Sequence, residues 1–118
     1  MTPFAKFLEG FGTLHDCTVT RFEWNPEART VTFEIEDIWW NFEGLPEYRG
    51  PASGTIVLGD VESVEIEMRE DAKALFISEF TVAPANAGRS LATIWFRGSG
   101  KVVVDFDQAR FPDAPPPA

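Results

Sequence analysis

Three consecutive residues, His15, Asp16 and Cys17, have the side-chain types of a general base, an orienting acid and a nucleophile. Nucleophilic catalysis needs the nucleophile within hydrogen-bond reach of the base, and the base held by a third group. On an extended strand, His15 and Cys17 would share one face about 7 Å apart, and Asp16 would point to the other face. We therefore predict no catalytic residue here. We expect His15 and Asp16 to bond nearby backbone groups and Cys17 to be a small core residue, because free cysteine is among the most buried residue types.

The other polar residues lack the spacing of a metal, cofactor or catalytic site. One histidine and one cysteine are too few for a His/Cys zinc site, and a single cysteine excludes an intrachain disulfide. The sequence contains no calcium-binding loop, phosphate loop or dinucleotide-binding glycine motif. Asp105 and Asp107 fall on one face of the last expected strand, and we interpret them as a solvated face. We predict that the protein holds no metal and no cofactor.

The pair Trp39-Trp40 is the strongest candidate for a binding site. Two large rings in sequence cannot both enter one core from a regular strand, so one ring should face outward or into a cleft covered by a loop. Tyr48 and Arg49 follow in the adjoining loop, and Trp, Tyr and Arg dominate binding hot spots. Alternatively, the loop that begins after Phe42 folds over the outer ring and buries it in a second small cluster.

Two strand-like segments, residues 30–36 and 63–68, indicate the elements that position these residues. They alternate apolar with polar or acidic residues, so one face of each should line a core and the other should face water. The inward residues are expected to be Val31, Phe33 and Ile35, and Val64, Ile66 and Met68; the outward ones are Glu34, Glu36, Glu65 and Glu67. This alternation is typical of antiparallel sheets.

The remaining sequence predicts one short N-terminal helix followed by strands. Thr2 is placed as the helix N-cap and Pro3 as the first helical residue. Glycine-, proline- and asparagine-containing turns separate about seven strands, which predicts an antiparallel β-sandwich or a strongly curved sheet. Residues 55–58 and 61–68 form either a tight hairpin or one strand with a bulge at Gly59. The helix is expected over 3–11, the other strands over 14–24, 29–40, 74–82, 90–97 and 101–107, and a long loop over 41–54. Residues 1–111 should form a single domain, with a disordered proline-rich tail over 112–118.

Composition narrows the classes of partner. Nineteen acidic and ten basic residues give a formal charge of −9, which disfavours nucleic acid and anionic membranes and favours a basic partner. Alternatively, the negative charge only keeps the protein soluble and indicates no partner. No signal-peptide pattern and no apolar run of membrane-spanning length occurs, so we expect a cytoplasmic protein.

A family resemblance rests on two short motifs. The segment Leu14-His15-Asp16-x-x-Val19-x-x-Phe22 and the later run from Thr55 to Val61 resemble small uncharacterised bacterial β proteins, among them immunity-protein-like families found beside secreted toxins. The resemblance implies a cytoplasmic β-sandwich-like domain that binds a toxin. It carries over no catalytic residue, and the Leu-His-Asp motif in such proteins would be structural.

Three hypotheses for function follow. The first is a non-enzymatic binding protein for a basic protein partner, with acidic strand faces and the tryptophan loop as its contact surface. The alternative is a small ligand-binding or hydrolytic protein with a cleft near His15, Trp39 and Trp40. The third is a structural homodimer in which the outward tryptophan packs across a two-fold axis. The predicted contact residues are Trp39, Trp40, Tyr48, Arg49, Glu34, Glu36 and His15.

Overall fold

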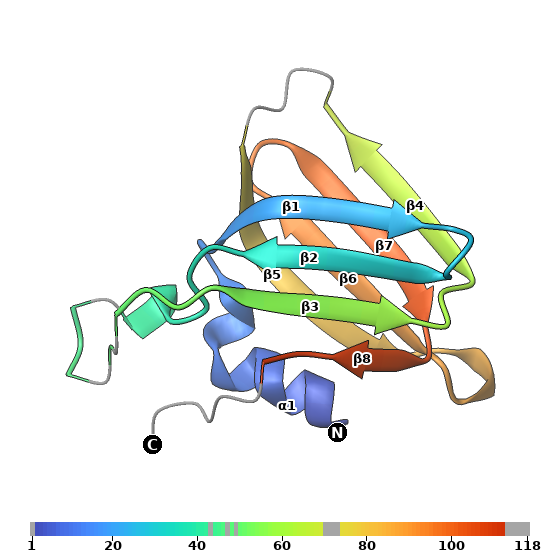
Figure 1. Ribbon diagram of the computed structural model, residues 1–118, viewed down its shortest axis with the longest axis horizontal. Helices are drawn as coiled ribbons and strands as arrows, with labels where there is room; N and C mark the ends of the chain where they lie inside the picture. The colour runs from blue at the N-terminus through green and yellow to red at the C-terminus, as the bar shows by residue number, and fades with distance from the viewer. Residues whose placement is uncertain (1, 43, 47, 49, 70–73, 113–118) are drawn as a thin grey trace.

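Eight antiparallel strands form one open sheet in the order β4-β7-β6-β5-β1-β2-β3-β8 (Figure 1). The computed structural model describes residues 2–42, 44–46, 48, 50–69 and 74–112. The strands are β1 (Thr18–Asn25), β2 (Thr30–Ile35), β3 (Gly54–Gly59), β4 (Ser63–Met68), β5 (Leu75–Pro84), β6 (Ser90–Phe96), β7 (Gly100–Phe106) and β8 (Gln108–Arg110). The prediction of a mainly β protein with a curved sheet and one short helix is confirmed.

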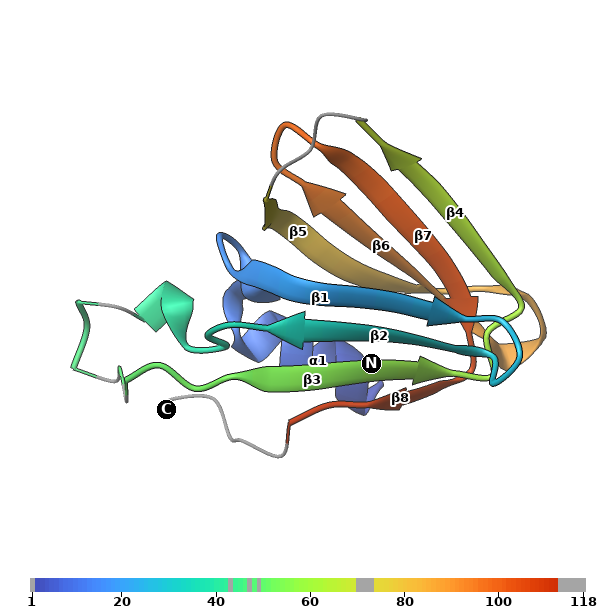
Figure 2. The ribbon, with the colours of Figure 1, turned by 45° about the horizontal axis from the view of Figure 1, so that its top comes forward.

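The sheet bends into two layers at the junction between β1 and β5. Only two residue pairs join these strands, Thr18 with Phe76 and Val19 with Leu75. Beyond those pairs the strands diverge, and Figure 2 shows β1, β2, β3 and β8 at a marked angle to β5, β6, β7 and β4. Register shifts within Val19–Arg21 and Ile77–Glu79 accompany the bend, as expected for β-bulges, which increase local twist.

The inner faces of the two layers form the hydrophobic core. Phe33 on β2 contacts Phe80 on β5 edge to face, with ring centroids 5.5 Å apart, so the layers meet directly. Val31, Phe33 and Ile35 are all buried, as the alternation of β2 predicts. On β4 the same inference holds only in part, because Ile66 is 48% exposed while Val64 and Met68 are half-buried. Ile66 is exposed because β4 is an edge strand of the sheet.

Helix α1 (Pro3–Gly10) packs against the core with three buried side chains, Phe4, Phe7 and Leu8. Phe4 contacts Phe80 and Phe106, so the helix touches the second layer, and Figure 1 shows it beside β8. The Thr2 side chain accepts a hydrogen bond from the backbone N–H of Ala5, which confirms the predicted cap. Short 3-10 turns cover Gly12–Leu14, Trp40–Phe42 and Asn86–Gly88.

The pairing of β3 and β4 differs from both sequence predictions. β3 pairs with β2 and β8, whereas β4 pairs with β7, so Gly59 is neither a hairpin turn nor a bulge. The short strand β8 was not predicted, because three residues carry too little periodicity to be recognised. Of the predicted tail, Pro112 alone lies within the described residues.

An ion-pair network fixes the segment between β3 and β4. Arg89 is only 13% exposed and donates to Asp105 Oδ1 at 2.7 Å and to the backbone oxygen of Asp60 at 2.5 Å. Its hydrogen bond to Asp105 raises the pKa of Arg89. The prediction that Asp105 belongs to a freely solvated face is therefore wrong, while Asp107 is exposed. The β3–β4 connection is held by these ion pairs and by backbone hydrogen bonds from Val61 N–H to Arg29 O and from Glu62 N–H to Asp105 O, not by a hairpin.

Candidate binding cleft

A cleft of about 430 Å³ opens at the junction between β1 and β5. Four segments contribute to it: the start of β1, the residues after β2, the loop before β3, and β5. Its lining consists of Asp16, Cys17, Thr18, Glu36, Asp37, Trp40, Tyr48, Pro51 and Phe76. The volume lies within the range of small-ligand sites, which is roughly 300–1,000 Å³.

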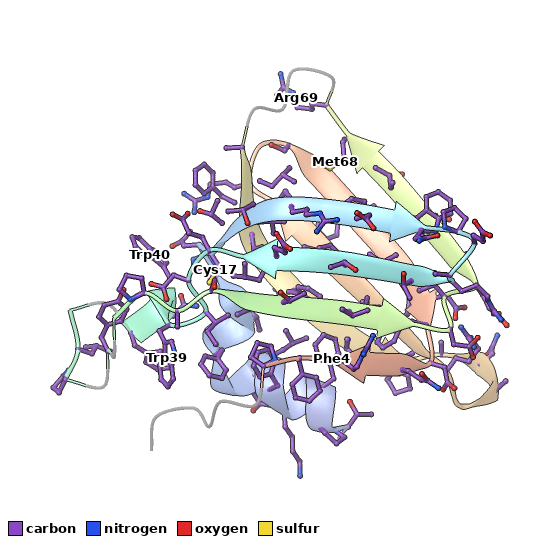
Figure 3. All side chains as sticks on the ribbon, viewed as in Figure 1. Phe4, Cys17, Trp39, Trp40, Met68 and Arg69 are labelled. Atoms are coloured by element: carbon purple, nitrogen blue, oxygen red, sulfur yellow. The ribbon has the colours of Figure 1, made fainter. Side chains whose placement is uncertain are left out.

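The two adjacent tryptophans separate as the sequence predicts. Trp39 is 6% exposed and contacts the ring of Phe11 at 5.1 Å, edge to face, whereas Trp40 is 44% exposed. Figure 3 shows Trp39 below the short 3-10 turn that begins at Trp40, on the side of α1, and the Trp40 side chain above that turn. The cause is the 3-10 turn Trp40–Phe42, which follows the end of β2, rather than the alternation of a continuous strand. Trp40 is thus available at the cleft.

Asp37 organises the loop that forms one wall of the cleft. Its side chain is buried, and Oδ1 accepts hydrogen bonds from the backbone N–H groups of Trp39 at 3.0 Å and Ala52 at 3.2 Å. Oδ2 accepts a hydrogen bond from the Tyr48 hydroxyl at 2.8 Å. One carboxylate therefore ties three points of the loop together. No local pattern predicted this role, since Asp37 resembles any acidic residue that follows a strand.

Cys17 lies at the inner end of the cleft and is buried, as predicted. Its thiol donates a hydrogen bond to the backbone oxygen of Asp37 at 3.3 Å. Burial, reinforced by the nearby Asp37 carboxylate, raises the pKa of Cys17 to about 12. A thiol with so high a pKa is a poor nucleophile at neutral pH, because only the thiolate reacts.

Iodoacetamide should therefore alkylate Cys17 very slowly in the folded protein. With the pKa raised from about 9 to about 12, the thiolate fraction near neutral pH falls roughly a thousandfold. Mass spectrometry of the native protein against the protein in urea measures the difference. Cys17→Ala gives the background, and equal labelling rates in native and denatured protein would contradict the burial described above.

The segment before β1 places the side chains of His15 and Asp16 near each other, with His15 Nε2 3.4 Å from Asp16 Oδ2, and each also binds a second partner. The residues Thr13, Leu14 and Asp16 have positive φ values of 56°, 55° and 64°, so the chain turns here instead of extending as a strand. His15 is exposed and its Nδ1 bonds the backbone oxygen of Ser78 at 2.8 Å, as expected of a structural histidine.

Asp16 accepts a hydrogen bond from the Arg97 guanidinium instead of the backbone bond predicted for it. It lines the cleft, whereas His15 is not among the lining residues. The strand that would have placed His15 and Cys17 on one face does not exist, because β1 begins at Thr18.

The other predicted contact residues are only partly brought together. Glu36 and Tyr48 line the cleft with Trp40. Glu34 lies outside it and pairs with Arg21 at 3.3 Å. Arg49 falls outside the described residues.

Phe76 is a cleft residue that the sequence did not single out. It is 42% exposed and pairs with Thr18 across the junction of the layers. The available signal was an aromatic residue within the strand predicted over 74–82. That signal becomes informative only when the partner strand is known.

The cleft has an acidic and aromatic character. Its lining includes three carboxylates, and no lysine, arginine or histidine occurs among the described residues that form it. No group of three or more metal-ligating side chains was found in the described ranges. None of the helices in the part of the chain that the structure describes has the length and apolar content that a membrane crossing requires.

Comparison with known proteins informs the fold. No protein-family model and no curated protein matches the sequence. Among solved structures, the chain is similar to an uncharacterized protein from Neisseria gonorrhoeae, with a TM-score of 0.54 and 15% identity. The match covers 85% of this chain and 93% of that protein. At this level of identity the similarity shows a shared fold and nothing about activity.

Proposed function

We propose that this protein is a non-enzymatic binding protein whose cleft recognises a basic protein partner. The observation that carries the proposal is that Trp40 and Glu36, both exposed, line a cleft with no basic residue among the described residues that form it. Exposed tryptophan is enriched at binding hot spots, and the charge of −9 steers a cationic partner toward the molecule. The sequence resemblance to immunity-like proteins adds that the partner is a toxin and the location cytoplasmic.

The hydrolytic alternative has less support. It needs a base at the reacting position, and His15 lies outside the cleft lining and bonds Ser78. The thiol of Cys17 is buried and protonated. Binding without catalysis is the function that this arrangement supports best.

A pull-down with paired tryptophan variants tests the proposal. The immobilised wild type should capture a basic protein from a lysate of the source cells at low salt, and high salt should reduce the capture by weakening electrostatic steering. Trp40→Ala should lower the affinity for that protein, once it is purified, by about tenfold or more. Trp24→Ala is the matched control, because Trp24 is also 44% exposed but lies outside the cleft.

Two outcomes would contradict the proposal. One is the absence of any captured basic protein whose binding depends on salt. The other is equal loss of affinity in the two tryptophan variants. Size-exclusion mass measurement belongs in the same experiment, since a dimer of the wild type that Trp40→Ala converts to a monomer would support the homodimer instead.

A further inference from the structure

We infer that the cleft binds the cationic side chain of an arginine presented by the partner. The inference rests on the proposed function, since it names the group that a basic partner inserts. Two aromatic side chains line the cleft from different elements. Trp40, in the turn after β2, is 44% exposed, and Phe76, on β5, is 42% exposed. Aromatic faces attract cations, and tryptophan does so most strongly. The protein already contains one such contact elsewhere, because Lys101 Nζ lies 4.9 Å from the ring centroid of Trp95.

The carboxylates of the cleft differ in what they already bind. Asp37 is held by three hydrogen bonds, and Asp16 by Arg97. Glu36 is exposed and forms no ion pair with any residue that the structure describes. Glu36 is therefore the carboxylate that can pair with an incoming cation, and Asp37 adds negative charge behind it. An anionic ligand would meet repulsion from Glu36 and Asp37, since the charge of Asp16 is compensated by Arg97.

A guanidinium suits this cleft better than an ammonium. Guanidinium is planar and stacks on aromatic rings. It is also more weakly hydrated than an ammonium group, so its transfer from water into the cleft costs less free energy. It can also donate two parallel hydrogen bonds to one carboxylate. A cleft of about 430 Å³ has room for an arginine side chain together with part of the adjoining partner backbone.

Titration with small probes tests the inference without any protein partner. N-acetyl-arginine amide is added to the wild type, and the indole N–H signals are followed by NMR, with the Trp40 signal assigned from the Trp40→Ala spectrum. The probe should produce saturable shifts at Trp40. N-acetyl-citrulline amide, a neutral molecule of nearly the same shape, should bind about tenfold or more weakly, because it lacks the charge. N-acetyl-lysine amide should bind more weakly than the arginine probe.

Paired variants place the binding in the cleft. Trp40→Ala and Glu36→Gln should each weaken binding of the arginine probe by about tenfold. Trp24→Ala and Glu65→Gln, which change exposed residues outside the cleft, should leave it unchanged. Non-saturable shifts, equal affinity for arginine and citrulline probes, tighter binding of the lysine probe, or equal effects of cleft and control variants would each overturn the inference.

The two proposals can fail separately. If a basic protein depends on Trp40 but the arginine probe does not bind, the binding function stands and the arginine inference is wrong. If the probe binds as expected but no protein partner is captured, the cleft chemistry stands and the function as a protein binder is wrong.

Discussion

Gly100→Ala should destabilise the protein by about 3 kcal/mol or more, within the range of the most damaging single substitutions. Gly100 begins β7 with a φ of +136°, a conformation that other residues rarely adopt. A Cβ built there would lie 1.9 Å from the backbone oxygen of Glu67, on the neighbouring edge strand. Because the obstacle is backbone, the β4–β7 pairing must shift. Urea denaturation followed by tryptophan fluorescence measures the loss.

Gly98→Ala provides the matched control in the same turn. Gly98 also has a positive φ, +68°, but a Cβ there would meet no atom within 4 Å. Gly98→Ala should therefore reduce the free energy of unfolding only by the cost of placing alanine in left-handed backbone, about 1–2 kcal/mol. The difference between the two variants therefore reports the collision with β4 together with the rarer backbone conformation of Gly100, and equal destabilisation would contradict the close approach of the two strands.

Asp37→Ala should cost about 3 kcal/mol and also open the cleft wall. The substitution leaves the backbone N–H groups of Trp39 and Ala52 and the hydroxyl of Tyr48 without their acceptor. Each unsatisfied buried polar group costs about 1–3 kcal/mol, and water that enters the loop recovers part of the total. Denaturation measures the stability. Acrylamide quenching of Trp39, measured in a background in which Trp24, Trp40 and Trp95 are replaced by phenylalanine so that Trp39 alone emits, should increase as the loop loosens.

Tyr48→Phe distinguishes the contributions of the two oxygens of the Asp37 carboxylate. It removes the hydrogen bond to Oδ2 and leaves both backbone donors on Oδ1. It should cost about 1 kcal/mol and leave the quenching of Trp39 nearly unchanged. If Tyr48→Phe were as damaging as Asp37→Ala, the backbone hydrogen bonds would not be what holds the loop.

Local patterns predicted the parts of the fold that depend on neighbouring residues. The alternation at Val31, Phe33 and Ile35 identifies a buried face, because successive side chains of a strand point in opposite directions. Thr2 and Pro3 identify the start of α1 by the geometry of a helix end. The separation of Trp39 and Trp40 was predicted correctly, although a 3-10 turn produces it.

Pairings between distant segments could not be predicted in this way. β4 pairs with β7 and not with β3, and no local signal at Gly59 distinguishes these outcomes. The same limit applies to Asp105, whose partner Arg89 lies in the connection just before β6, and to Phe76, whose exposure depends on where β1 diverges from β5. Of the candidate site, the sequence therefore identified the residues near Trp40 but missed the wall that faces them.

The two-pair junction between β1 and β5 gives the cleft a mechanical consequence. The β1–β5 pairing and two backbone hydrogen bonds, from Asp16 N–H to Ile77 O and from Ile77 N–H to Cys17 O, join the layers at this seam, and the cleft lies across it, with Thr18 on one side and Phe76 on the other. An occupant that contacts both Thr18 and Phe76 would link the two layers. An occupant that binds this arrangement more tightly than one in which the layers have separated would stabilise the junction and suppress its local opening.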